Sequence, residues 1–162
     1  MVYLNDNLIR IINSAKQKLK EKSQSVLFGD LADGESSIPD NLNFPNYCEF
    51  LKVCNGARCG DIDLWSINEL LQNQFYIVGM DGGKDVWLCI GQVLYEPLML
   101  NKQDEKVYLF RKDELDNTPI FCFESFGDLM GNYVFGEGYR DIVPNAEKDE
   151  WYIFLEENNF FY

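Results

Sequence analysis

The sequence contains no histidine among its 162 residues. This absence removes the commonest metal ligand and the commonest general base of proteins. The chain also lacks the phosphate-binding patterns GxxxxGK[ST] and GxGxxG, and the G-x-S-x-G pattern of serine hydrolases. We therefore expect a protein that binds no cofactor and is not an enzyme.

Long apolar runs are also missing, since none approaches the roughly 20 residues that a membrane-spanning helix needs. The first residues mix Asn, Asp and Arg with apolar side chains, which is unlike a signal peptide. No CxxC pair occurs, and most cysteines lie within apolar runs, as small buried residues do. The five cysteines are Cys48, Cys54, Cys59, Cys89 and Cys122. These features predict a cytoplasmic protein with no membrane association.

Positive charge is scarce, with 14 Lys and Arg against 27 Asp and Glu and a net charge of −13. Residues 1–22 carry a net charge of +3, so the remaining 140 residues carry −16. A body this acidic repels nucleic acid and anionic lipid, which excludes both as expected partners. It attracts a basic protein, although acidity can also serve solubility alone.

Apolar residues make up 46% of the chain and aromatic residues 15%, which is typical of a folded protein. The length predicts a single domain over residues 1–162. Apolar spacing predicts a helix over residues 4–19 and a second helix that starts near Pro45 and stops at Asn55-Gly56. Ser66 and Glu69 form a capping-box pattern, which predicts a short helix over residues 67–73.

Strand patterns occupy much of the middle of the sequence. Phe75–Val78 and Val86–Ile90 are predicted to form a hairpin around Gly82-Gly83. Residues 23–43 and 111–119 are predicted to be loops. Pro97 suggests that its strand lies at the edge of the sheet. The remaining predicted elements are strands over 61–65, 93–100, 106–110 and 120–123, a helix after a Ser125–Asp128 cap, and a last helix after Pro144-Asn145.

The acidic turn Asp81-Gly-Gly-Lys-Asp85 resembles the start of a calcium-binding loop. An EF-hand requires Glu at its twelfth position, where this chain has Gln92, so we expect no metal. Paired carboxylates among Asp61, Asp63, Asp81 and Asp85 would suit a glycosidase, but 27 acids make chance pairs common. No catalytic residue is therefore assigned.

A protein-binding surface is the remaining hypothesis for these acids. Asp61, Asp63 and Trp65 alternate along one strand and so point to one side of the sheet. Together with Asp81 and Asp85 they would place carboxylates around an aromatic anchor, which suits a basic protein. Alternatively, Trp65 is the hydrophobic staple of the following helix and lies in the core.

The order of these patterns resembles the SUKH superfamily of Smi/Knr-like proteins. The similarity runs from about Ile38 to Phe135, and more loosely to Leu155, with a long loop at 23–37 and Lys84 as departures. Its pieces are Ile38-Pro39, Tyr47-x-x-Phe50-Leu51-x-x-x-Asn55-Gly56, the strand into Trp65, Ile77-x-Gly79-x-Asp81-Gly82-Gly83 with Asp85, and Phe123-x-Ser125-Phe126-x-x-Leu129.

The resemblance implies an α+β fold in which helices pack around a curved, largely antiparallel sheet. It also implies an immunity protein that neutralises a cognate polymorphic toxin by stoichiometric binding. Such toxins often act on nucleic acids and tend to be basic, which matches the charge of this chain. The alternative that the family offers is a regulatory scaffold with several protein partners.

Overall fold

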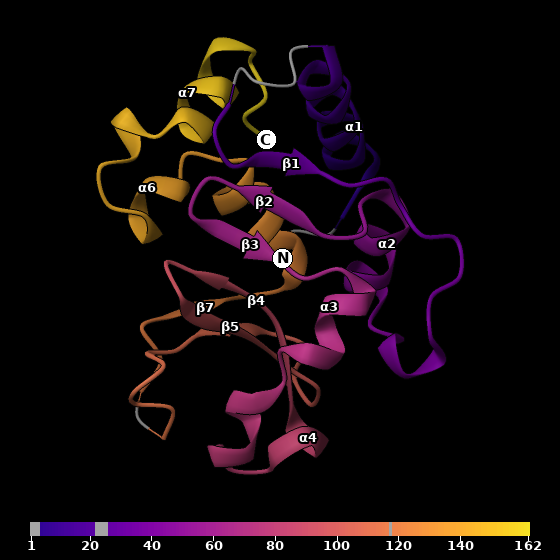
Figure 1. The fold of residues 1–162 in the computed structure, drawn as a ribbon, viewed down its shortest axis with the longest axis vertical. Helices are drawn as coiled ribbons and strands as arrows, with labels where there is room; N and C mark the ends of the chain where they lie inside the picture. Colours follow the sequence, from indigo (N-terminus) through magenta and orange to yellow (C-terminus); the bar gives the residue numbers. More distant parts are fainter. Residues whose placement is uncertain (1–3, 22–25, 117) are drawn as a thin grey trace.

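The fold is built on one seven-stranded sheet, as the computed structural model of the chain shows (Figure 1). The structure describes residues 4–21, 26–116 and 118–162. All six strand pairings are antiparallel, and each strand pairs with its neighbours in sequence, in the order β1 to β7. The strands are β1 Gly29–Leu31, β2 Ala57–Cys59, β3 Ile62–Leu64, β4 Trp87–Val93, β5 Glu96–Asn101, β6 Val107–Leu109 and β7 Phe121–Phe123. The predicted α+β class with an antiparallel sheet is confirmed.

The helices surround this sheet, and side-chain caps begin several of them. Asn5 accepts the amide of Leu8 at 3.0 Å at the start of the first helix. Ser66 and Glu69 form the predicted capping box before α3. Asp149 accepts the amides of Trp151 and Tyr152 at the start of the last helix. The helices are α1 Asp6–Glu21, α2 Pro45–Val53, α3 Ile67–Gln72, α4 Gly83–Val86, α5 Phe126–Asp128, α6 Tyr139–Ile142 and α7 Glu150–Glu157.

Shorter helical turns complete the chain. The 3₁₀ turns are η1 Asp40–Leu42, η2 Phe75–Gly79 and η4 Ala146–Lys148, and η3 Leu129–Val134 is a π-helical continuation of α5. Ser125 accepts the amide of Asp128 at 3.0 Å, which is the second predicted cap.

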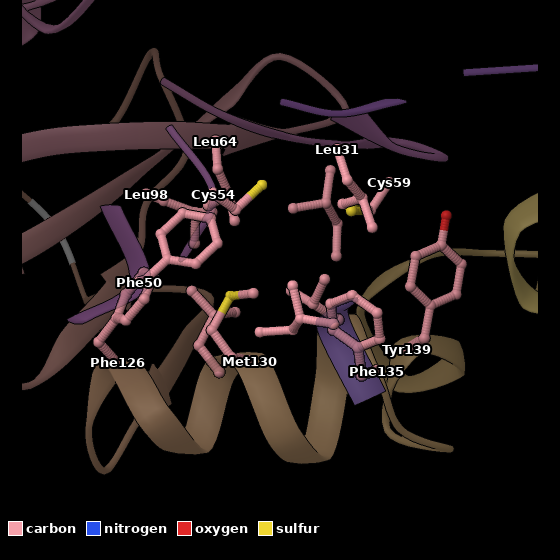
Figure 2. Packing of buried hydrophobic residues seen from close by; sticks show 14 of the residues in the cluster. Leu31, Phe50, Cys54, Cys59, Leu64, Leu98, Phe126, Met130, Phe135 and Tyr139 are labelled. Atoms are coloured by element: carbon pink, nitrogen blue, oxygen red, sulfur yellow. The ribbon is translucent and has the colours of Figure 1, made fainter. Parts of the chain in front are cut away.

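The main core lies between one face of the sheet and the α5–η3 segment (Figure 2). Phe50 and Phe126 meet there with ring centroids 5.2 Å apart, and Met130 and Phe135 extend the layer along the helical segment. The apolar stripe of α1 adds five buried residues to the same core, as its helical spacing predicted: Leu8, Ile11, Ile12, Ala15 and Leu19.

The predicted hairpin over residues 75–90 is wrong. Phe75–Gly79 forms η2, and Gly82-Gly83 leads into α4. The side-chain amide of Gln74 takes the place of the expected strand: its Oε1 accepts the Cys89 amide at 2.9 Å and its Nε2 donates to the Cys89 carbonyl at 2.8 Å. One side chain thus satisfies the backbone of β4 that a neighbouring strand would have satisfied.

The hairpin turn lies instead at Leu94-Tyr95, where both residues have positive φ angles of 50° and 69°. Residues 93–100 therefore form the end of β4, a turn and most of β5, and not one strand. The prediction of a loop over residues 23–43 also fails, because this segment includes β1 and η1. Residues 23–25 of that segment, and residue 117 in the predicted loop 111–119, lie outside the described residues.

Pro97 lies in an interior strand and not at the edge, since β5 pairs with both β4 and β6. The Pro97 carbonyl accepts the Phe110 amide at 3.1 Å, just beyond the end of β6. The N–H that proline lacks would point toward the same side, toward Phe110. Proline therefore removes only the reciprocal hydrogen bond of this pair, at the end of the β5–β6 ladder.

Candidate functional site

The second face of the sheet, opposite the main core, carries the predicted residue Asp63. Register places Asp30, Arg58, Asp63 and Gln92 in one row across β1 to β4. Arg58 Nε lies 3.3 Å from Asp63 Oδ1, and Gln92 Nε2 donates to Asp63 Oδ2 at 2.8 Å. Both oxygens of Asp63 are thus held, so this carboxylate is fixed in place.

A hollow of about 390 Å³, which we call the polar groove, opens beside this row. Three acids and one cation contribute to its wall, so the groove is negative overall. Arg58 is held by Asp63 and by the ring of Phe28, whose centroid lies 4.1 Å from its guanidinium carbon. The lining residues are Asp30, Ala32, Asn55, Gly56, Ala57, Arg58, Asp63, Leu64, Trp65 and Glu69.

Trp65 combines the two roles that the sequence left open. Its half-buried side chain packs against the main core and also lines the polar groove. The indole Nε1 is buried and has no oxygen or nitrogen partner among the described residues. It faces the thiol of Cys89, where burial raises the pKa of the cysteine and the indole N–H partly offsets that rise.

A second hollow, which we call the aromatic pocket, lies farther along the same face and measures about 330 Å³. Trp87 stands at 83° to Tyr108 and at 90° to Phe110, with both centroid distances 5.5 Å. The indole Nε1 of Trp87 donates to the Asp81 carbonyl at 3.0 Å. The lining residues are Met80, Asp81, Trp87, Asn101, Tyr108, Phe110, Leu115, Asp116 and Pro119.

The predicted site residues are thus divided between these two hollows. Asp63 and Trp65 line the polar groove, and Asp81 lines the aromatic pocket. Asp85 is exposed and lines neither, while Asp61 lies at the β2–β3 turn. Along β5 the level of Asp63 and the level of Trp87 are four residues apart, a distance of about 13 Å.

The segment from Trp65 to Asp81 connects the two hollows and carries three strongly exposed apolar side chains. Leu71 is 88% exposed, Phe75 60% and Val78 87%. We call these three residues the apolar ridge. Figure 1 shows α3 and the following turns leading away from the end of β3 toward α4. Their exposure was not predicted, because Phe75 and Val78 had been placed in a buried strand.

Asp61, at the edge of this face, has a carboxyl group whose charged form is disfavoured in the folded protein. Burial raises the pKa of its carboxyl, and the nearby carboxylates of Asp149 and Asp63 raise it further. Its backbone amide donates to Tyr139 Oη at 3.0 Å, and that hydroxyl donates to Asp149 Oδ2 at 2.8 Å. The β2–β3 turn is thereby tied to α6 and to the start of α7.

We expect Asp61→Asn to stabilise the protein at neutral pH. A pKa raised in the folded state means that folding stability falls as the pH rises from 3.8, the ordinary value, through the folded pKa. The neutral amide removes this loss, so the two proteins should converge in stability as the pH falls below that window. Urea unfolding between pH 3 and pH 8 measures the effect, with Asp40→Asn, at an exposed position, as the control for loss of one charge. Equal stability of variant and parent at every pH would contradict it.

The described residues include no group of three or more Cys, Asp or Glu side chains placed to hold a metal ion. The five cysteines are free thiols, and burial raises the pKa of each, most strongly at Cys54 and Cys59. A thiol kept protonated is a poor nucleophile. Burial therefore does not activate any of these five thiols as a nucleophile.

Comparisons with known proteins do not assign this chain to a family. No family model matches this chain, and no curated protein matches it in sequence. None of the described helices has both the length and the apolar character that crossing a membrane requires.

Proposed function

We propose that this chain is an immunity protein of the SUKH type, which binds a basic protein toxin one to one in the cytoplasm and blocks it. The observation that carries the proposal is the apolar ridge, which lies on the chain segment that connects the two acid-lined hollows. Interfaces commonly combine an apolar centre with a polar rim, and a few anchor side chains supply most of the binding energy. Leu71, Phe75 and Val78 provide such a centre.

Charge supports the same function. The polar groove carries Asp30, Asp63 and Glu69 against Arg58 alone, and the aromatic pocket carries Asp81 and Asp116 with no cation in its lining. Long-range attraction by an acidic surface speeds the encounter with a basic partner. The order of the SUKH-like motifs adds independent support for a toxin as that partner.

The test uses the C-terminal domain encoded by the reading frame immediately upstream of this gene as the candidate toxin. Co-expression of the chain should restore growth of cells that produce this domain, and calorimetry should give a one-to-one complex. The association rate should fall as ionic strength rises. Failure to bind the domain, with several weaker partners recovered from the native host, would favour the regulatory alternative.

The surface variant for this test is Leu71→Ser with Val78→Ser. Both side chains are almost fully exposed, so the fold should tolerate the change, while affinity should fall by about tenfold or more for each anchor lost. The matched control is Leu27→Ser with Ile120→Ser, which removes two exposed apolar side chains outside the ridge. Equal affinity of the ridge variant and the control would remove the ridge from the interface.

A further inference from the structure

The aromatic pocket combines aromatic rings with two carboxylates. Trp87, Tyr108 and Phe110 form two nearly perpendicular walls, since Tyr108 and Phe110 lie within 33° of one another and Trp87 crosses both. Two carboxylates, Asp81 and Asp116, complete the lining, and no Lys or Arg is part of it. Aromatic faces and carboxylates both attract a cation.

Hydrogen bonds hold the walls of this pocket in place before any ligand arrives. The Trp87 indole N–H donates to the Asp81 carbonyl at 3.0 Å, and the Tyr108 hydroxyl donates to Asp104 Oδ2 at 2.7 Å. Phe110 and Met80 are buried beneath, in a small apolar cluster with Ile77, Cys89 and Met99. A site whose rings are already oriented loses little conformational entropy on binding.

We propose that the aromatic pocket binds the guanidinium group of an arginine side chain presented by a protein partner. A guanidinium is planar, weakly hydrated and able to stack on a ring while it donates to carboxylates, which a lysine ammonium does less well. The pocket, about 330 Å³, has room for such a side chain. The inference rests on the proposed function, because it names how a basic partner is recognised.

The test requires no knowledge of the partner. The probe is N-acetyl-arginine amide, titrated into ¹⁵N-labelled full-length protein while the three indole N–H signals are followed by NMR. The Trp87 signal should shift in a saturable way, because its N–H lies at the pocket wall. The Trp151 signal is an internal control, since its Nε1 is buried and donates to the Val134 carbonyl at 2.8 Å.

Two further probes define the chemistry. The neutral isostere N-acetyl-citrulline amide should cause no saturable shift, and N-acetyl-lysine amide should bind more weakly than the arginine probe. N-acetyl-arginine with a free carboxylate should also bind more weakly than the amide probe, because that carboxylate would be repelled by Asp81 and Asp116. Tighter binding of this carboxylate probe would identify a small-molecule ligand and overturn the assignment to a protein side chain.

The matched variants are Asp81→Asn with Asp116→Asn, and Asp40→Asn with Asp141→Asn. Both pairs remove two negative charges from exposed positions, but only the first pair lies in the pocket. We expect the first pair to weaken the arginine probe about tenfold and the second to change it less than twofold. Equal weakening by both pairs, or no Trp87 shift at all, would overturn the inference.

These outcomes separate the pocket from the proposed function. A chain that binds the upstream-encoded domain but gives no Trp87 shift with arginine retains its proposed function and loses this site. A chain that gives the shift but does not bind that domain retains the guanidinium site and loses the proposed toxin partner.

Discussion

Gly91→Ala is expected to destabilise the protein by about 3 kcal/mol, the upper part of the range for overpacking. A Cβ at this position would lie 2.1 Å from the Asp63 carbonyl oxygen and 3.1 Å from the Leu64 Cα. Both are backbone atoms, so no side-chain rotation can relieve the clash. Strand β3 must move away from β4, which weakens the ladder between them.

Urea unfolding of parent and variant measures this effect, and Gly79→Ala is the matched control. A Cβ at Gly79 meets no atom within 4 Å, so that variant should keep the parent stability within about 0.5 kcal/mol. A loss of less than about 1 kcal/mol for Gly91→Ala would show that β3 and β4 can separate at little cost.

Tyr139→Phe is expected to destabilise the protein by about 2 kcal/mol, since it breaks two partly buried hydrogen bonds at once. The Tyr139 side chain is fully buried, and its hydroxyl accepts the Asp61 amide and donates to Asp149. Without it, the amide and the carboxylate each lose a partner in a partly buried site. The benzene ring of phenylalanine fills the same space, so no large cavity contributes.

The control for this prediction is Tyr95→Phe, because Tyr95 is 71% exposed at the β4–β5 turn. It should change the free energy of unfolding by no more than about 0.5 kcal/mol. Thermal and urea unfolding should agree on the difference between the two variants. If Tyr139→Phe were as stable as Tyr95→Phe, the link between the β2–β3 turn and α7 would contribute nothing measurable.

The parts of the fold that the sequence predicts well are those whose signals are local. The stripe of α1, Pro45 at the start of α2 and the Ser66–Glu69 capping box each depend on residues within a few positions of one another. Their hydrogen bonds form within the same segment, so neighbouring elements do not alter them. The strands β3, β6 and β7 follow from alternation for a similar reason.

The wrong prediction of a hairpin over residues 75–90 arises from a contact between residues that are distant in sequence. Phe75–Val78 has the composition of a strand, yet Gln74 already occupies the backbone groups of Cys89 with which such a strand would pair. Nothing in the local pattern distinguishes this glutamine from an exposed one. Residues 75–79 turn into η2 instead, and the apolar side chains expected in the sheet stand exposed.

The candidate site could be predicted only in part. The alternation of Asp61, Asp63 and Trp65 correctly places Asp63 and Trp65 on one face, but the position of the 81–85 turn depended on the wrong hairpin. Trp87 and Tyr108 were missed as partners, because their meeting requires the register of β4 with β5 and β6. The signal was present in the alternating runs Trp87-Leu-Cys89 and Tyr108-Leu-Phe110.

The sequential strand order has a consequence for how the chain reaches this structure. Each strand pairs with the strand before it in sequence, so no strand pairing has to bring together two strands that are separated by a third. The connections are two residues long at β2–β3 and β4–β5 and much longer at β1–β2 and β3–β4, so the two tight hairpins close at the lowest entropic cost. The ends of the chain are the exception: Asn5 Nδ2 donates to Tyr162 Oη at 2.7 Å, across almost the entire sequence. That contact joins residues 157 positions apart, so it requires that both segments are already in place on the sheet.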